Sequence, residues 1–277
     1  MDKKIVIAVD DSRHSKNAVR YAAGIYEVLK DMKFTLMHVQ PTISEYLLDE
    51  AKKSPQAYAE LEKVNLKNSE TAQGLLEKYK AKDILEFSMA GHFDAVIMGR
   101  RGLSGLGEVF IGSVSANVVN HSANTPVWLV DEKGTSKDIL VAVDGSENSL
   151  KAVDHLALMT AKNTDVKISF FHVAPKLKDF CAVDFGEIQT EALEEIIRKG
   201  DKECIDQFFS HAKKRLNEAG IQESQINFKV SEGLFRVGKA VLDEFQQGNF
   251  GTLVVGRRGM NKKFFTGSVS GYLMNGF

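Results

Sequence analysis

The chain contains the same sequence unit twice, and this repeat limits what it can fold into more than any other feature. Four short segments recur in the same order: IVIAVDDS at 5–12 as ILVAVDGS at 139–146, MHV at 37–39 as FHV at 171–173, FDAVIMGRRG at 93–102 as FGTLVVGRRG at 250–259, and GSVS at 112–115 as GSVS at 267–270. The polar, glycine-containing segment 131–137 separates the two copies. We therefore expect two tandem domains, the first over 1–133 and the second over 134–277.

Within each copy, continuous apolar runs alternate with amphipathic segments, which is typical of a parallel sheet flanked by helices. In the first copy the pattern predicts a strand over 4–9, a helix over 15–29 and a strand over 33–39. The expected fold class is therefore α/β, with two doubly wound parallel-sheet domains in tandem. Ser12 and Ser146 lie near the start of the first helix of each copy, where we expect their hydroxyls to cap free backbone N–H groups.

The two copies differ in the strands that they contain. Between the His-Val pair and the glycine segment, the first copy is 23 residues shorter than the second. In this stretch the second copy has a helical segment over 201–219 and an alternating, strand-like segment over 226–230, and the first copy has no counterpart of that strand. The second copy in turn has no counterpart of the apolar strand at 125–130. Each sheet is thus expected to lack a different strand.

Composition limits the kinds of partner. Charges of both signs are spread along the chain and sum to −1, so no basic patch indicates a nucleic-acid partner. No run of about 18 apolar residues indicates a membrane span, and no secretory signal precedes the first strand. We expect a cytoplasmic protein. Cys181 and Cys204 are the two cysteines, and their spacing indicates neither a disulfide framework nor a zinc site.

The residues that indicate a ligand follow the apolar strands. Asp10, Val39 and Gly99 each come at or just after the end of such a strand. In open parallel sheets ligands bind beyond these carboxyl ends, so the three loops are expected to converge on one crevice. Glycine at 99 and 102 lets the backbone approach a ligand without an intervening Cβ. The segment 112–115 precedes a helical stretch, so its amides and hydroxyls suit a phosphate, with a simple N-cap as the alternative.

The spacing Gly99-x-x-Gly102, then nine residues, then Gly112-Ser113 resembles the ATP-binding signature of the universal stress protein family. The resemblance covers nearly the whole chain and includes the strand-ending Asp, the His-Val pair and the Thr-Pro-Val strand. It implies two Rossmann-like domains of strand order 3-2-1-4-5, the first lacking strand 3 and the second lacking the last strand. It also implies an ATP or AMP site in the first domain, at the residues Asp10, Val39, Gly99, Gly102, Gly112, Ser113, Val114 and Ser115.

In this implied site, Asp10 holds the adenosine and the backbone of Val39 reads the adenine edge, while the glycines and the segment 112–115 line the ribose and phosphates. Arg100 and Arg101 are further candidates as guanidinium donors to phosphate, although exposed loop arginines without such a role are common. Asp10 and Asp11 together have two interpretations, a Mg²⁺ site beside the phosphates or solvated turn formers, and paired acids after a strand are more often the latter.

The resemblance implies a nucleotide-dependent regulator in a stress response. A stress scaffold that binds no nucleotide and acts on a protein partner is one alternative, and a weak ATPase is another. The sequence has no Walker motif and no catalytic base at a recognisable spacing, so we assign no catalytic residue and expect at most slow hydrolysis.

Two further expectations concern the second copy and the assembly. Gly259 and Gly267 are separated by seven residues instead of nine, which shortens an extended loop by about 7 Å. We therefore do not expect the second copy to bind the nucleotide. Members of the family with one domain pair through their last strands, so the strand at 125–130 is expected to pair with another chain in a homodimer built on the first domain.

Overall fold

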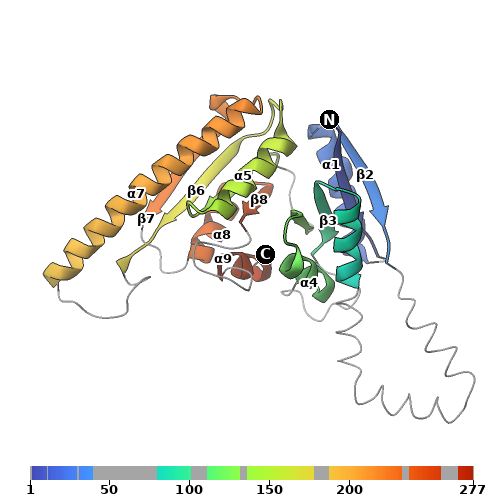
Figure 1. Ribbon diagram of the computed structural model, residues 1–277, viewed down its shortest axis with the longest axis horizontal. Coiled ribbons are helices and arrows are strands. Elements are labelled where there is room, and N and C mark those ends of the chain that lie inside the picture. Colours follow the sequence, from blue (N-terminus) through green and yellow to red (C-terminus); the bar gives the residue numbers. More distant parts are fainter. Residues whose placement is uncertain are drawn as a thin grey trace, which may run out of the picture. The chain divides into compact units, whose positions relative to one another are not determined.

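The chain folds into two compact units, Met1–Glu132 and Lys133–Phe277, each of which contains a parallel four-stranded sheet (Figure 1). The computed structural model describes residues 2–10, 12–29, 31–39, 80–100, 111–131, 136–177, 187–232, 237–256 and 268–276. All strand pairs within the two sheets are parallel, and helices lie between successive strands. The predicted α/β fold class with two tandem sheets is confirmed.

The first unit is built around two central strands. Its elements are β1 (Lys3–Ala8), α1 (Arg13–Val28), β2 (Met32–Met37), a helix over 80–90, β3 (Ala95–Gly99), α4 (Ser113–His121) and β4 (Val127–Val130), and its sheet order is β2-β1-β3-β4. Val6 on β1 and Val96 on β3 are fully buried in a cluster that includes Ile84 of the 80–90 helix and Val118 of α4. Strand side chains alternate between faces, and α1 packs against β1, β3 and β4. The central strands are therefore apolar on both faces.

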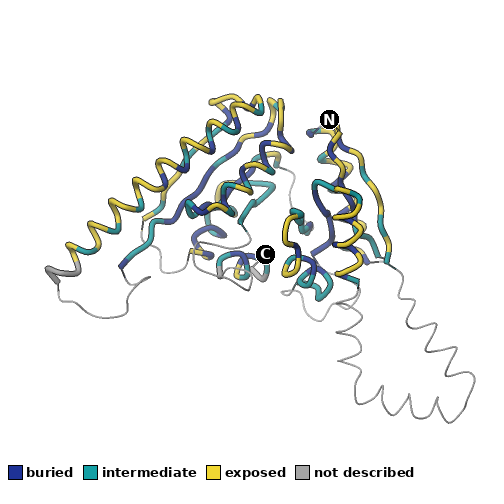
Figure 2. The backbone as a smooth tube through the Cα atoms, in the orientation of Figure 1, coloured by how far each residue is buried: buried dark blue, intermediate teal, exposed yellow. Residues whose placement is uncertain are grey.

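The second unit repeats this plan with a longer helix. Its elements are β5 (Ile139–Val143), α5 (Glu147–Thr160), β6 (Ile168–Ala174), α7 (Glu187–Glu218), the 3-10 turn η1 (Glu223–Gln225), β7 (Ile226–Glu232), α8 (Val237–Gln247), β8 (Thr252–Val255) and α9 (Ser268–Gly276), and its sheet order is β7-β6-β5-β8. α7 runs alongside β6 and packs on α5, with its buried side toward the sheet and its outer side exposed (Figure 2).

Neither sheet contains five strands within the described ranges. In the numbering of the repeat, the first sheet has the counterparts of strands 2, 1, 4 and 5, and the second has those of strands 3, 2, 1 and 4. The two sheets thus show overlapping parts of the order 3-2-1-4-5, and the complete five-stranded order remains a prediction.

The main difference from the expected elements is the length of α7. It begins at Glu187, whereas the apolar pattern predicts a start near Asp201, so this prediction was wrong by almost four turns. Residues 191–200 are largely exposed, and an exposed helical segment has no apolar periodicity from which its start can be read. Despite this length, neither α7 nor any other helix in the described ranges combines the length and apolarity needed to cross a bilayer.

Candidate functional site

The carboxyl ends of β1, β2 and β3 lie level with one another. Ala8 on β1 is paired with Met37 on β2 and with Met98 on β3. Asp10 and Val39 each follow this row by two residues, and Gly99 follows it by one. Because neighbouring strands are about 4.8 Å apart, all three residues lie along one short edge of the sheet. The structure thus places these predicted site residues together.

Asp10 and two serines connect the end of β1 to the first turn of α1. The backbone N–H of Ser12 donates to Asp10 Oδ1 at 3.0 Å, and Ser12 Oγ accepts from the N–H of Ser15 at 3.1 Å. The Ser15 hydroxyl donates to the Asp10 carbonyl oxygen. Ser12 is therefore the N-cap of α1, as predicted, and Ser146 caps α5 in the same way. Among the described residues, the N–H of Ser12 is the one group that donates a hydrogen bond to the Asp10 carboxylate.

The histidine of each His-Val pair ties two strand ends together. Nδ1 of His38 lies 2.9 Å from the Val9 carbonyl oxygen, and Nδ1 of His172 lies 3.0 Å from the Val143 carbonyl oxygen. A carbonyl oxygen can only accept, so both rings donate from Nδ1. The His38 ring thereby links the end of β2 to the end of β1, and the His172 ring links the end of β6 to the end of β5. This is a structural role, and it explains why both copies carry the residue.

Gly99 lies where the first turn of α1 passes close to the end of β3. Its φ is not positive, and a Cβ at this position would lie 2.6 Å from the carbonyl carbon of His14 and 2.7 Å from its oxygen. The absence of a side chain therefore lets the first turn of α1 approach the end of β3. The predicted contact of Gly99 with a nucleotide stays a prediction.

The start of α4 is fastened to the end of β3. The N–H of Gly112 donates to the Arg100 carbonyl oxygen at 2.8 Å, and the buried Ser115 hydroxyl donates to the Gly99 carbonyl oxygen at 2.9 Å. Gly112 is the N-cap residue, and no side chain caps the helix. The first N–H groups of a helix have no partner within it. The uncapped start of α4, with Ser113 in its first turn, therefore lies at the same edge as Asp10 and Val39.

The structure says less about the other residues that are predicted to line the site. Val39 and Val114 pack their side chains against the core cluster of the first unit, so only their backbone groups are available for recognition. Arg100 is buried and forms an ion pair with Asp131, with 3.2 Å between Nε and Oδ2, which fixes the end of β3 to the end of β4. Arg101 and Gly102 lie outside the described residues, as does Asp11, the second carboxylate of the Mg²⁺ interpretation.

The corresponding edge of the second unit differs in its carboxylate. Asp144 Oδ1 accepts from the Ser149 hydroxyl at 2.6 Å and from the N–H of Ser146 at 3.1 Å. In the first unit the equivalent Ser15 hydroxyl donates to a backbone carbonyl instead. The Asp144 carboxylate is therefore held by one bond more than that of Asp10. Most of the 256–270 segment lies outside the described residues.

One functional candidate was not found from the sequence. Nε2 of His172 lies 3.1 Å from both carboxylate oxygens of Asp201 on α7. The two residues are 29 positions apart, and the sequence pattern placed the beginning of the helix at Asp201. Comparison of the two copies does not reveal this pair, because the structure describes no counterpart of α7 in the first unit.

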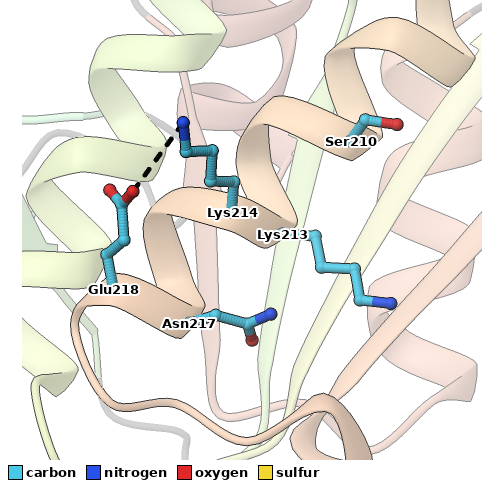
Figure 3. A pocket seen from close by; sticks show the side chains of 5 residues that line it. All are labelled: Ser210, Lys213, Lys214, Asn217 and Glu218. Atoms are coloured by element: carbon cyan, nitrogen blue, oxygen red, sulfur yellow. Dashed lines mark ion pairs between the residues drawn. The ribbon is translucent and has the colours of Figure 1, made fainter.

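The described residues also form a shallow hollow of about 560 Å³ on the outer side of α7 (Figure 3). It is lined by Ser210, Lys213, Lys214, Asn217 and Glu218. Lys214 is paired with Glu218 at 3.9 Å, and Lys213 with Glu223 at 2.9 Å. This end of α7 leads into the beginning of β7, so the hollow lies toward the amino ends of the strands. It is not the edge at which the predicted site residues meet.

Comparison with known proteins identifies the same family for both units. The family model described as the universal stress protein family matches residues 1–131 and again residues 135–277. A universal stress protein of Mycolicibacterium smegmatis is 28% identical over 190 residues, which are 61% of this chain and 63% of that protein. A universal stress protein of Thermus aquaticus is 31% identical over 138 residues, which are 47% of this chain and 99% of that protein. The match to the first relative thus spans less than two thirds of its length.

A solved structure with the same fold covers almost the whole chain. The crystal structure of a universal stress protein from Archaeoglobus fulgidus DSM 4304 aligns with a TM-score of 0.58 over 98% of this chain and 94% of that one. The two sequences are 19% identical. This likeness therefore concerns the fold.

Proposed function

Because the chain belongs to the universal stress protein family, we propose that its first unit binds ATP or AMP and that the nucleotide regulates the chain's contacts in a stress response. The observation that carries this proposal is the edge at which Asp10, Val39 and the uncapped start of α4 meet. Its donors and acceptors fit a nucleotide: a carboxylate for hydroxyl groups, backbone groups for a base edge, and helix N–H groups for phosphate.

In the proposed complex, most recognition is by backbone groups. The carboxylate of Asp10 accepts from the ribose hydroxyls, and the main chain of Val39 contacts the adenine. The phosphates lie at the start of α4, where Gly112 and Ser113 offer N–H and hydroxyl donors and the helix dipole favours negative charge. Arg101 and Gly102 belong to this proposal through the family signature.

We assign no catalytic residue, and the proposed role is regulation in the cytoplasm, with at most slow hydrolysis. Mg²⁺ enters with ATP as the counterion of its phosphates. In the described residues, no group of three His, Cys, Asp or Glu side chains is arranged to hold a metal ion.

The second unit is the better candidate for the scaffold function, a surface that binds a protein partner without a nucleotide. Its aspartate, Asp144, is engaged by the Ser149 hydroxyl, and its glycine segment is two residues shorter. The first feature leaves the carboxylate fewer free acceptor positions for ribose hydroxyls, and the second shortens the loop that would surround the phosphates. One nucleotide site per chain is the expected stoichiometry.

Isothermal titration of ATP and AMP, each with Mg²⁺, into nucleotide-free chain tests this proposal. We expect one site per chain, lost in Gly112→Val because the added side chain crowds the start of α4, and retained in Gly267→Val, the matched change in the second copy. Absence of binding to the wild type, or binding that survives Gly112→Val, would contradict the nucleotide proposal and favour the scaffold function.

We also propose that two chains form a homodimer through the first unit. β4 pairs with β3 along one edge, and within the described residues no strand pairs with its other edge. An unpaired edge presents a row of backbone donors and acceptors that a second copy of the same strand can satisfy.

A further inference from the structure

One side of α1 is exposed although the same side of its counterpart, α5, is buried. Val19 and Tyr26 are seven positions apart on α1, so they lie on one side of this helix, and they are 37% and 47% exposed. Their counterparts in the repeat are Val153 and Thr160 of α5, whose exposed fractions are 0%. The two units therefore differ in what covers equivalent positions.

The edge strand of the first unit shows the same difference. Leu36 of β2 is 62% exposed, whereas its counterpart, Phe170 of β6, is fully buried. Figure 2 shows β6 buried along most of its length and β2 mainly exposed or intermediate. The Phe34 ring contacts the Tyr26 ring, with 6.2 Å between centroids, and Leu36 shares a face of the strand with Phe34. We call the surface formed by Val19, Tyr26, Phe34 and Leu36 the α1–β2 face.

In the second unit a helix covers the equivalent surface. α7 packs on α5 and on β6, and its Phe209 ring contacts the Phe170 ring with 6.3 Å between centroids. The buried side chains of α7 recur every three or four residues and are Ile205, Phe208, Ala212 and Leu216. Among the described residues of the first unit, no helix lies at this place, because the 80–90 helix packs with Met37 in the core cluster of the opposite sheet face.

The charges beside the two surfaces differ in sign. In the second unit Asp154 of α5 forms an ion pair with Arg215 of α7. The counterpart of Asp154 in the repeat is Arg20, an exposed residue of α1, and Lys16 is exposed one turn before it. A helix that lies against α1 as α7 lies against α5 therefore meets a positive charge at the place of Arg215. Two cations would repel each other there, so the α1–β2 face favours a helix with an acidic residue at this place.

We propose that the α1–β2 face docks an amphipathic helix of a partner protein, with an apolar stripe like that of α7 and an acidic residue opposite Arg20. Burial of Val19, Tyr26 and Leu36 drives the association, because their apolar surface leaves water. The charge provides selectivity, because α7 of a second copy carries an arginine at the place that faces Arg20. This docking does not depend on the proposed nucleotide site.

Fluorescence anisotropy of a labelled synthetic peptide, titrated with the full chain in the absence of nucleotide, tests the docking. The peptide has the sequence of residues 201–219 with Arg215→Glu, so it keeps the apolar stripe of α7 and carries the acidic residue. We expect saturable binding at one site, weakened about tenfold or more in Leu36→Asp, where a charge would have to be buried. Val230→Asp is the matched control, because Val230 is 47% exposed on β7, an edge strand of the second sheet. It should keep the wild-type affinity.

An exchange of charges tests the orientation of the bound helix. The peptide that retains Arg215 should bind the wild type about fivefold more weakly than the peptide with glutamate at this place, and Arg20→Glu in the chain should reverse the order. The same order of affinities in the wild type and in Arg20→Glu would contradict the placement of the acidic residue opposite Arg20.

Absence of saturable binding to the wild type, or equal binding to Leu36→Asp, would overturn the proposal. Two other occupants of the face would overturn it as well, and each has its own signature. If the face joins two copies of the chain, Leu36→Asp lowers the mass of the free chain in light scattering. If residues of the chain outside the described ranges cover the face, peptide binding increases hydrogen exchange within 40–79.

Discussion

At Gly99 the first turn of α1 approaches the end of β3 so closely that a side chain would not fit. The His14 carbonyl group occupies the space in which a Cβ would stand, whereas at Gly256, the equivalent residue of the second unit, the nearest backbone atom is 3.3 Å away. The same glycine in the two copies therefore meets different steric demands. The backbone of α1, unlike the end of a side chain, cannot move aside without displacing the whole first turn.

Gly99→Ala should destabilise the first unit by about 1–3 kcal/mol, because overpacking against backbone forces the helix to shift. Trp128 on β4 is the single tryptophan, so its fluorescence during urea unfolding of the full chain reports this unit. Gly256→Ala should leave the Trp128 transition unchanged. An unchanged midpoint in Gly99→Ala would show that α1 can retreat without cost.

At the scale of elements, α7 is held to its sheet by aromatic side chains as well as by the contact of Asp201 with His172. Phe170 of β6 is fully buried and stacks on Phe228 of β7 at 5.2 Å between ring centroids. Phe209 of α7 lies 4.5 Å from the Phe228 ring. This three-ring cluster joins two strands and the helix, and its helical member, Phe209, lies in the half of α7 that follows Asp201. Where the structure describes the side chains of the first half of α7, from residue 191 on, no ring contact of this kind is present.

Phe170→Ala should lower the free energy of unfolding of the second unit by about 3–5 kcal/mol, the usual range for removing a buried aromatic ring. The long α7 contributes strongly to helical ellipticity, so circular dichroism during urea unfolding should show an earlier transition. The Trp128 fluorescence transition should not move, since this residue lies in the other unit. If both transitions moved together, the two units would not unfold separately.

At the scale of the whole molecule, the proposed homodimer depends on pairing between the β4 strands of two chains. Multi-angle light scattering should give a mass near 61 kDa across the micromolar range, twice the 30.7 kDa of the chain. Salt should have little effect on this mass, because strand pairing depends on backbone hydrogen bonds more than on exposed charges. A mass of one chain throughout this range would contradict pairing through β4.

Much of the architecture could be predicted because it rests on a repeat and on apolar periodicity. The strand-ending Asp10 and Asp144 and the caps Ser12 and Ser146 were found in this way, since each depends on a local pattern. Contacts between distant elements could not be predicted. Asp201 meets His172 only after α7 has packed, and the demand on Gly99 comes from the backbone of His14, which carries no signal in the sequence.

The repeated histidine gives the molecule an internal comparison. His38 and His172 contact the same kind of carbonyl through the same ring atom. In the part of the chain that the structure describes, His38 is exposed, whereas His172 is buried and has Asp201 at its other nitrogen. Duplication of the unit has thus placed one chemical group in two settings within a single polypeptide, one near water and one enclosed beside an acid. Because both rings are in one chain, their spectra are recorded at the same temperature, buffer and concentration. A difference between the two spectra therefore reflects the burial of His172 and its contact with Asp201.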